Sequence, residues 1–211
     1  RACEQPPDFH PEGDVFVHTR LMLALLPRDA SVLLVLATLF HDLGKPPTME
    51  RDHTGGIRFS GHESVSAQMT EKIMRRLRFS NEEIEATTAM VQNHMVFKDV
   101  QNMRVSRLKR FLARPTFDDE LELHHVDCLA SHGNLDNYEF LKRRDEDLAN
   151  EPLIPPPLVT GHDLIALGWK PGPKFKTVLE AVQVRQLEGI LRTREEAISW
   201  VEKEFTATPL D

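Results

Sequence analysis

The chain has 211 residues, with 26 Lys and Arg against 33 Asp and Glu, so its formal net charge is -7 and its pI is about 5.8. This length allows a sizeable core without disulfide or metal staples. The acidic average field excludes a generic nucleic-acid coat protein and confines any RNA contact to a local basic patch. Cys3 and Cys128 cannot build a disulfide framework, which favours a reducing, cytoplasmic location. The longest apolar stretch, residues 21–40, is interrupted by Pro27, so we expect no membrane span.

Helical periodicity recurs along the chain while alternating strand patterns are nearly absent, so the sequence predicts an all-α fold. Residues 1–13 are expected to be irregular, and Asp14 is the predicted N-cap of the first helix. A loop with a short hairpin is expected within residues 48–61. The segment 30–43 is apolar on nearly every side, which predicts a buried central helix. Helices are predicted at 15–26, 30–43, 62–78, 80–95, 105–113, 117–131, 135–149, 161–167, 174–188 and 194–205.

A proline-rich segment divides the chain. Pro152, Pro155, Pro156 and Pro157 favour a stiff, extended spacer rather than a helix. The sequence therefore predicts a helical domain over residues 1–149, a linker over 150–159 and a small helical C-terminal module over 160–211.

Several histidines and one aspartate fall on the apolar faces of their predicted helices, namely His18, His41, His62, His94 and Asp127. A single inward imidazole is most simply a core histidine that bonds a carbonyl. A carboxylate on an apolar face is costly unless a cation or several donors meet it, and Asp42 is a second inward acid. Two buried acids with four imidazoles predict a metal. The donor set suits Fe, Mn, Co, Ni or Zn, and the lack of cysteine ligands argues against a structural zinc site.

The string His41-Asp42-Leu43-Gly44-Lys45, preceded by His18 and followed by Asp127, resembles the motif of the HD superfamily of metal-dependent phosphohydrolases. The resemblance implies a helical HD-domain bundle in which His18, His41, Asp42 and Asp127 coordinate one divalent ion. His62 and His94 fall where two-metal members have further histidines, so one or two ions are implied, with Mg as a further option. Such a metal activates water for attack on a phosphate ester.

Lys45 and Asp42 are the candidate catalytic residues. Lys45 follows the end of the helix that carries His41, where it would clamp a phosphate oxygen or assist the leaving group; an exposed loop lysine is the alternative. We interpret Glu63 as an acid that favours a helix start. The other histidines are interpreted as ordinary residues, although His124 and His125 lie close enough to Asp127 in sequence to be partners of the ligands.

Further segments resemble the HD half of bacterial CCA-adding tRNA nucleotidyltransferases and their poly(A) polymerase relatives. These segments are residues 10–14, 17–19, 59–63, 77–80, 93–94, 159–164, 167–168 and 171–173. The resemblance implies a nucleotide or RNA substrate and a C-terminal segment that approaches tRNA. Lys176 departs from the family pattern, which often has a small residue there.

In that family a nucleotidyltransferase head with a Gly-Ser turn and paired acids precedes the HD half. This chain contains no Gly-Ser dipeptide, and the acidic triplet 145–147 is interpreted as a solvated helix face beside basic residues. Nucleotidyl transfer is therefore not expected from this chain alone. A head domain of the same polypeptide is a candidate partner.

Two basic clusters are candidate sites for RNA. The first spans residues 98–114, where six cations face Asp99 alone for a net charge of +5, and the second surrounds the turn at 171–173. The second cluster lies at a predicted helix N-terminus, where free amides favour phosphate. The candidate RNA- or phosphate-binding residues are Arg104, Arg107, Lys109, Arg110, Lys170, Lys174 and Lys176.

These observations leave three functions open. The first is hydrolysis of phosphate esters on nucleotides or RNA termini, and the second is the tRNA-binding half of a nucleotidyltransferase. The third is a structural helical domain whose polar core is satisfied by hydrogen bonds alone.

Overall fold

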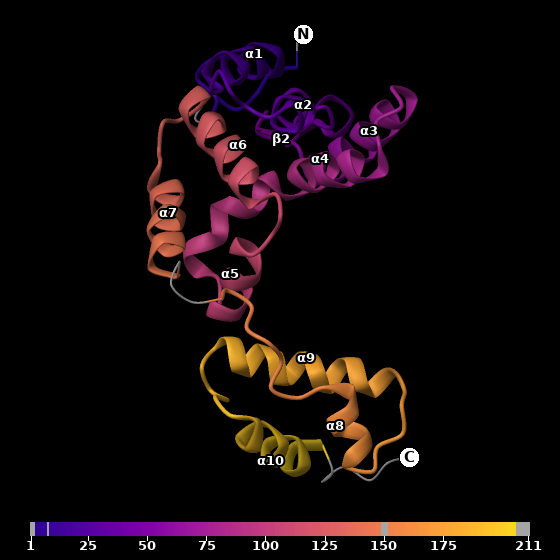
Figure 1. Ribbon diagram of the computed structural model, residues 1–211. Helices are drawn as coiled ribbons and strands as arrows, with labels where there is room; N and C mark the ends of the chain where they lie inside the picture. The colour runs from indigo at the N-terminus through magenta and orange to yellow at the C-terminus, as the bar shows by residue number, and fades with distance from the viewer. Residues whose placement is uncertain (1–2, 8, 149–151, 206–211) are drawn as a thin grey trace. The chain divides into compact units, whose positions relative to one another are not determined.

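The computed structural model describes residues 3–7, 9–148 and 152–205 (Figure 1). Helices dominate this part of the chain, and its strands form one short antiparallel hairpin of β1 (Glu50–Arg51) and β2 (Ile57–Arg58). The predicted all-α fold is therefore confirmed. None of the described helices has the length and apolar character needed to cross a membrane. The cytoplasmic location stays a prediction.

The predicted helices are all present, with limits that differ from the prediction by three residues or fewer. The segment after residue 93 differs more, because the chain tightens there into a 3-10 helix that was not predicted from the sequence. The elements are α1 (Val15–Leu25), α2 (Val32–Phe40), η1 (Pro46–Thr48), α3 (His62–Arg76), α4 (Asn81–Asn93), η2 (His94–Asn102), α5 (Val105–Leu112), α6 (Phe117–Ala130), α7 (Asp136–Leu148), α8 (Gly161–Ala166), α9 (Pro173–Leu187) and α10 (Arg194–Phe205).

Side-chain caps fix where the helices that carry the candidate ligands begin. The carboxylate of Asp14 accepts a hydrogen bond from the backbone N–H of Val17 at 2.9 Å, as predicted for the N-cap of α1. Ser31 caps α2 in the same way. Ser80 and Glu83 form a reciprocal capping box at the start of α4. The caps therefore set the register in which α1, α2 and α4 present their inner faces.

Contacts divide the chain into two compact units. Unit 1 comprises Arg1–Gln101 and Pro115–Glu146, and unit 2 comprises Asn102–Arg114 and Asp147–Asp211. Unit 2 thus includes α5, which the sequence-based limit at residue 149 assigns to the first domain. The reason is local, since Ser106 of α5 donates to Glu188 at 2.9 Å and Arg110 donates to Gln183 at 2.8 Å. The other domain limits stay a prediction.

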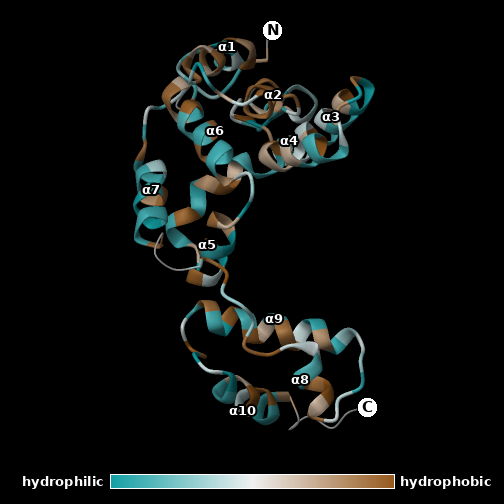
Figure 2. Cartoon of the chain, in the orientation of Figure 1, coloured by the Kyte–Doolittle hydropathy of each residue, from teal (hydrophilic) through white to brown (hydrophobic). Residues whose placement is uncertain are grey.

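In unit 1 the core lies where α3 packs on α4 and where α2 contacts α1, α4 and α6. Its buried apolar side chains are Met22, Leu34, Ala37, Phe40, Ala67, Met74, Ile84, Met90, Val91, Leu123, Val126 and Ala130. The predicted buried central helix is buried on one side only, through Leu34, Ala37, Thr38 and Phe40, although Figure 2 shows α2 as largely apolar. Val32 is 67% exposed and Leu39 is 43% exposed, because the neighbouring helices cover only one side of α2.

Unit 2 has a separate apolar core, in which α9 packs against α5, α8 and α10. Leu158, Leu167, Trp169, Phe175 and Trp200 are partly buried against this core. Its buried side chains are Val159, Leu164, Val178, Val182, Leu191, Ala197 and Val201.

Candidate metal centre

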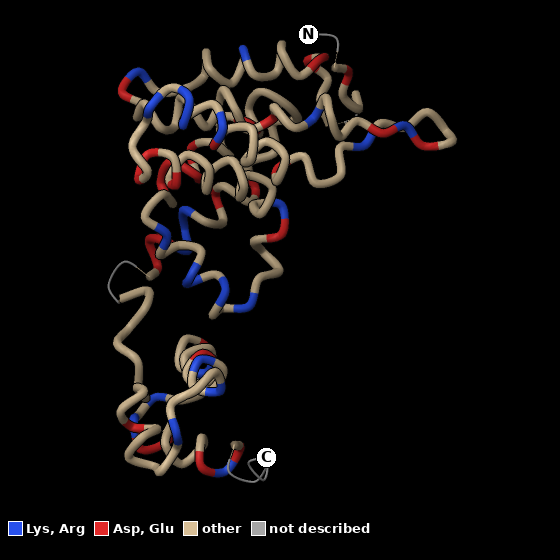
Figure 3. Tube along the Cα trace, turned by 90° about the vertical axis from the view of Figure 1, so that its right-hand side faces the viewer, with Lys and Arg blue, Asp and Glu red and all other residues tan. Residues whose placement is uncertain are grey.

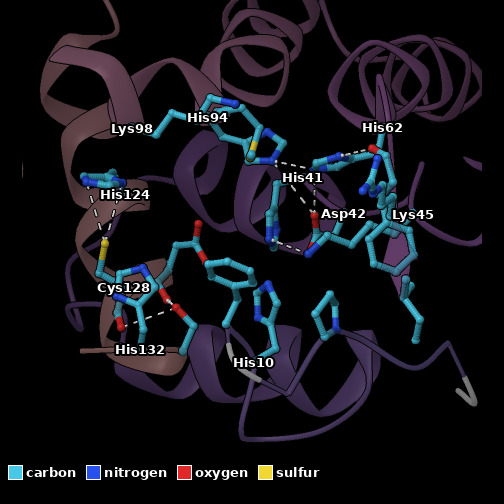
Figure 4. A pocket seen from close by; sticks show the side chains of 18 of the residues that line it. His10, His41, Asp42, Lys45, His62, His94, Lys98, His124, Cys128 and His132 are labelled. Carbon is cyan, nitrogen blue, oxygen red and sulfur yellow. Dashed lines mark hydrogen bonds and ion pairs between the residues drawn. The ribbon is translucent and has the colours of Figure 1, made fainter. Parts of the chain in front are cut away.

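Four imidazoles from separate segments of unit 1 lie close to the carboxylate of Asp42. Figure 4 shows three of them, those of His41, His62 and His94. His18 lies on α1 and is fully buried, and His41 directly follows α2 and is 1% exposed. His62 begins α3 and His94 begins η2, and they are 5% and 6% exposed. Residues that are far apart in sequence therefore place several metal-binding groups in one small volume.

Backbone carbonyls orient three of these imidazoles. In each case the ring Nδ1 donates to the carbonyl oxygen three residues earlier, at 2.8 Å for His41, 2.9 Å for His62 and 2.6 Å for His94. A carbonyl can only accept, so Nδ1 carries the proton and a neutral ring keeps the Nε2 lone pair for another partner. Metal-binding histidines in proteins are held by this kind of outer hydrogen bond.

Asp42 lies at the centre of the group and is 2% exposed. Its Oδ2 is 3.1 Å from His41 Nε2, whereas its Oδ1 is 3.4 Å from His62 Nε2 and 3.9 Å from His94 Nε2. Burial raises the pKa of Asp42, but the charges of His41 and Lys45 outweigh burial and hold this pKa well below its ordinary value. The carboxylate is therefore ionised, with Oδ2 toward His41 and Oδ1 toward His62 and His94.

Asp127 on α6 lies at the wall of the same site. Its Oδ1 is 3.1 Å from His18 Nε2, and its side chain is 26% exposed. Burial raises its pKa, but the neighbouring rings of His18 and His41 lower it further than burial raises it. Asp127 is thus an ionised second acid that faces the imidazoles from α6.

Gly44 explains how His62 approaches Asp42. A Cβ at this position would lie 2.2 Å from the backbone oxygen of His62 and 2.7 Å from the backbone N of Ser66. The N–H of Gly44 donates to Ser66 Oγ at 2.8 Å. The loop after α2 therefore packs directly on the start of α3, and any larger residue would push the two segments apart.

Lys45 is buried rather than an exposed loop residue, with 6% of its surface accessible. Its Nζ lies 2.7 Å from Asp42 Oδ2 and donates to Gln5 Oε1 at 2.6 Å. The structure therefore places the two candidate catalytic residues in direct contact. Gln5 was not identified from the sequence.

A cavity of about 610 Å³ opens onto this group. Its wall includes His41, Asp42, His62, His94 and Asp127, while His18 lies behind the wall. Other residues line the cavity or support it without having been predicted as site residues. The family-like segments 10–14 and 59–63 and the basic cluster 98–114 gave a signal for some of them. These residues are Gln5, His10, Glu12, Arg58, Phe59 and Lys98.

His124 and Cys128 line the cavity opposite His62 and Lys45 (Figure 4). The ring of His124 stacks on Phe97 with centroids 4.6 Å apart and contacts Cys128 Sγ at 3.6 Å. Burial lowers the pKa of His124 to about 4. His125 stacks on Tyr138 instead. Both rings therefore contact neighbours other than the candidate ligands, and they can affect the site only through packing.

The spacing of the potential ligand atoms fits a metal ion. Two ligand atoms that each lie about 2.1 Å from one ion, at angles between octahedral and tetrahedral, are about 3.0–3.4 Å apart. The closest pairs from His18 to Asp127, His41 to Asp42 and His62 to His94 are each 3.1 Å. Among the described residues, His18 Nε2, His41 Nε2 and both Asp42 oxygens make no hydrogen bond of good geometry, although Asp127 lies at ion-pair distance from His18 and Lys45 from Asp42.

The pair of His62 and His94 points to a cation independently. Burial lowers the pKa of both, to about 4 for His94, so both rings are neutral at pH 7. Both Nδ1 atoms are donors, so two lone pairs face each other at 3.1 Å. Facing lone pairs need a cation between them or beside them.

The candidate RNA-binding residues all lie in unit 2. Figure 3 shows Lys and Arg along α5 and around the start of α9. Arg110 of α5 and Lys176 of α9 line one cavity of about 820 Å³, and Glu180 also lies in its wall. Lys174 and Lys170 are exposed nearby in sequence, and Arg104, Arg107 and Lys109 flank Arg110 on or beside α5. The structure thus brings one member of each predicted basic cluster to the same cavity.

Comparisons with known proteins agree with this geometry. The family model of the HD domain matches residues 15–129. An A-adding tRNA nucleotidyltransferase of Deinococcus radiodurans is 34% identical over 210 residues, which cover 93% of this chain and 48% of that protein. A CC-adding tRNA nucleotidyltransferase of Thermus thermophilus is 36% identical over 167 residues, or 77% of this chain and 38% of that protein. No solved structure matches the chain.

A Multifunctional CCA protein of Burkholderia multivorans is 32% identical over 111 residues, which cover 52% of this chain and 26% of that protein. The chain spans about half the length, or less, of these curated relatives. The resemblance to the HD half of tRNA nucleotidyltransferases is thus confirmed. Because the family model covers more than half of the chain and includes His18, His41, Asp42 and Asp127, this chain belongs to the HD domain family.

Proposed function

We propose that this chain uses a metal centre in unit 1 to hydrolyse phosphate esters on nucleotides or RNA termini. The observation that carries the proposal is the convergence of unpaired donor atoms from His18, His41 and Asp42 beside an open cavity of about 610 Å³. A structural polar core would satisfy these atoms with hydrogen bonds of good geometry, whereas here they meet only at ion-pair distances, with Lys45 Nζ 2.7 Å from Asp42 Oδ2. The third function, a purely structural domain, is therefore the least supported.

In this proposal one ion is held by His18, His41, Asp42 and Asp127, and a second by Asp42, His62 and His94. Both triads His18–His41–Asp42 and Asp42–His62–His94 have donor atoms within 4.8 Å of one another. Asp42 would be shared, because its Oδ2 lies nearest His41 and its Oδ1 nearest His62. When bound, a divalent ion supplies a water of lowered pKa and polarises a phosphoryl oxygen.

The chain's own residues complete the site. Lys45 places a positive charge 2.7 Å from Asp42, at the cavity wall, where it can contact a phosphate oxygen. Arg58 and Lys98 line the same cavity and add positive charge for an anionic substrate. Burial raises the pKa of Cys128 to about 12, so this thiol is not a nucleophile, and water remains the attacking group.

The donor set also bears on the metal. Imidazole nitrogen with carboxylate oxygen suits Fe, Mn, Co, Ni or Zn, and both described cysteines are buried thiols outside the ligand triads. Mg²⁺ favours oxygen ligands and retained water, so four imidazoles favour a transition metal over it.

Replacement of Asp42 tests the proposal. Asp42→Ala removes the shared ligand, so we expect loss of bound metal. The turnover of phosphodiester and phosphomonoester substrates should fall by more than the roughly 100-fold that removal of an outer partner of a ligand can cost. Asp99→Ala, at an exposed aspartate of η2, is the matched control. Metal content by elemental analysis and turnover are measured on both variants. Unchanged metal content and activity in a folded Asp42→Ala protein would contradict the proposal.

A second function is supported by unit 2. We propose that its basic residues contact the phosphates of tRNA, because Arg110 and Lys176 line one cavity and the relatives above are named as tRNA nucleotidyltransferases. Arg110 already has partners inside unit 2, since it donates to Gln183 and lies 3.5 Å from Glu180. The exposed residues Lys174 and Lys176 are therefore the better contacts to test.

Titration with tRNA at several salt concentrations tests this second function. The double variant Lys174→Ala/Lys176→Ala should lower the magnitude of the salt slope by up to about 0.9 for each phosphate that it no longer neutralises. Lys203→Ala, at an exposed lysine of α10, should leave the slope unchanged. Binding that does not depend on salt, or no binding by the unaltered chain, would overturn it.

A further inference from the structure

His18 differs from the other three imidazoles in what holds it. His41, His62 and His94 each donate through Nδ1 to a backbone carbonyl three residues earlier. The Nδ1 of His18 instead lies 2.6 Å from Oε1 of Glu12, a side chain from the segment before α1. The corresponding carbonyl, that of Val15, accepts from Thr19 Oγ1 at 2.8 Å. His18 is thus the one of these four whose partner a substitution can remove.

The surroundings of Glu12 indicate a built contact. Its side chain is 7% exposed, and His18 is fully buried. The same Oε1 accepts from Nδ1 of His10 at 2.9 Å, and the rings of His10 and His18 meet edge to face with centroids 4.9 Å apart. Oε2 of Glu12 has no hydrogen-bond partner among the described residues. A nearly buried carboxylate that leaves one oxygen unpaired is costly, so its retention calls for a role beyond packing.

We propose that Glu12 is a positioning residue for the first metal ion, and this inference rests on the metal centre proposed above. A proton held on Nδ1 by the Glu12 carboxylate leaves the Nε2 of His18 as a lone pair, 3.1 Å from Asp127 Oδ1. The carboxylate also increases the electron density of the ring and strengthens Nε2 as a ligand. Without Glu12, the ring of His18 would move its proton to Nε2 or turn, and either change removes the ligand.

His10, Glu12 and His18 could instead form a metal site of their own, since their ligand atoms lie within 4.8 Å of one another. The distances favour hydrogen bonds. Both imidazoles meet the same oxygen at 2.6 and 2.9 Å, which suits two N–H donors on one carboxylate. An ion on this side of His18 would need both Nδ1 atoms deprotonated. Metal stoichiometry separates the two arrangements.

The test is a titration of the full chain with Mn²⁺, in which electron paramagnetic resonance measures the free ion. Glu12→Ala should weaken the Mn²⁺ step that depends on His18, identified by its loss in His18→Ala, roughly 10- to 100-fold, the range found for outer partners of histidine ligands. Glu12→Gln keeps an acceptor oxygen and should recover part of the affinity. The other step, assigned to Asp42, His62 and His94, should change little in both variants.

The matched control is Glu63→Gln. Oε2 of Glu63 lies 3.7 Å from Nδ1 of His62, but that ring already donates to the carbonyl of Phe59 at 2.9 Å. Removal of the Glu63 charge should therefore leave both Mn²⁺ steps within about twofold, well below the effect of removing an outer partner. Equal weakening by Glu63→Gln and Glu12→Gln would show a general charge effect and would overturn the positioning role.

A second readout needs no metal. Nitrogen-15 chemical shifts of the imidazoles should report His18 with its proton on Nδ1 in the unaltered protein and on Nε2 in Glu12→Ala. Unchanged affinity and an unchanged tautomer in folded Glu12→Ala would overturn the inference while leaving the hydrolase proposal intact. An unaltered chain that binds no Mn²⁺, Ni²⁺ or Zn²⁺ would overturn both, and a further ion that is released only on replacement of His10 would favour the separate site.

Discussion

Unit 2 buries an apolar core, whereas unit 1 buries imidazoles and carboxylates beside an apolar core of its own. In unit 2 the ion pair of Asp163 and Arg194 lies outside the apolar core, and Asp163 also caps α8. In unit 1 the charges of Asp42 and Lys45 are enclosed, at 2% and 6% exposure. The two units therefore place their charges in opposite environments.

The difference separates stability from function. Enclosed ionised groups cost free energy unless a cation or a full set of hydrogen bonds meets them. Unit 1 retains this cost in a cluster that faces a cavity, and its donor atoms suit a metal. The chemistry of unit 2 is confined to its surface, where the basic residues lie. Comparison of the two units in one molecule provides an internal control for any effect assigned to the metal centre.

Each unit has its own reporter. The two tryptophans, Trp169 and Trp200, both lie in unit 2, and the single tyrosine, Tyr138, lies in unit 1. Tryptophan fluorescence therefore follows the unfolding of unit 2. Hydrogen exchange of peptides from α3 and α4 follows unit 1.

The largest expected effect is on unit 2. Leu164 on α8 is fully buried in its apolar core, so Leu164→Ala should lower the free energy of unfolding of unit 2 by about 2–5 kcal/mol. Tryptophan fluorescence against denaturant measures this change. Mn²⁺ affinity should be unaffected, and Ile165→Ala, at a 49% exposed neighbour, is the control. Loss of metal binding in Leu164→Ala would show that the units do not act separately.

A fall in pH should destabilise unit 1. Burial lowers the pKa of His94 and of His124 to about 4, so the folded protein excludes protons that the unfolded chain accepts near pH 6.5. As the pH falls from above 6.5 to about 4, each of these two histidines should therefore cost the metal-free unit 1 roughly 3 kcal/mol of stability. The raised pKa of His41 acts in the opposite direction, because its contribution to stability is lost as the pH rises. Because the pKa of Asp42 is held well below its ordinary value, protonation of Asp42 should add to the loss of stability only at still lower pH. Hydrogen exchange at pH 7, 5.5 and 4 measures the loss, and equal loss in both units would contradict it.

The fold and much of the site followed from patterns that are local in sequence. Helix limits depend on caps such as Asp14 and Ser80 and on apolar periodicity, and these are visible in the chain itself. The inward histidines were found because the face of a helix follows from spacing. The resemblance supplied the ligand order, which periodicity could not.

The rest of the site depends on contacts between distant segments. Gln5 reaches Lys45 across 40 positions, and nothing in the sequence around either residue specifies that pairing. Glu12 was visible as part of a family-like segment, but its contact with His18 needed the chain path before α1. The exposed side of α2 was missed for a similar reason, because hydropathy reports which residues could be covered and not which neighbours cover them.

Metal binding should raise the stability of unit 1. At 100 times its dissociation constant, a divalent ion that binds only the folded state adds about 2.7 kcal/mol to the stability of unit 1. Addition of Mn²⁺ to chelator-treated protein should slow hydrogen exchange in α3 and α4 and leave the tryptophan transition of unit 2 in place. A shift of the unit 2 transition by the same amount would mean that the ion binds elsewhere or that the units unfold together.

The smallest expected effect is an increase in the stability of unit 1. His94→Leu removes a buried ring whose Nε2 faces that of His62 at 3.1 Å, and it puts an apolar side chain of similar size among Val91 and other buried residues. The metal-free unit 1 should become more stable by about 1 kcal/mol, since a desolvated, repelling polar pair is removed. The same variant should bind fewer Mn²⁺ ions and should show a flatter acid profile, because one of the two histidines whose pKa is lowered to about 4 is gone. His53→Leu, on the exposed hairpin loop, is the control and should change neither the stability nor the number of bound Mn²⁺ ions.

Hydrogen exchange without metal measures the stability of unit 1, and Mn²⁺ stoichiometry measures the number of bound ions. If His94→Leu loses stability and keeps full metal binding, His94 is a structural residue, and the buried polar cluster of unit 1 is smaller than the proposed centre requires.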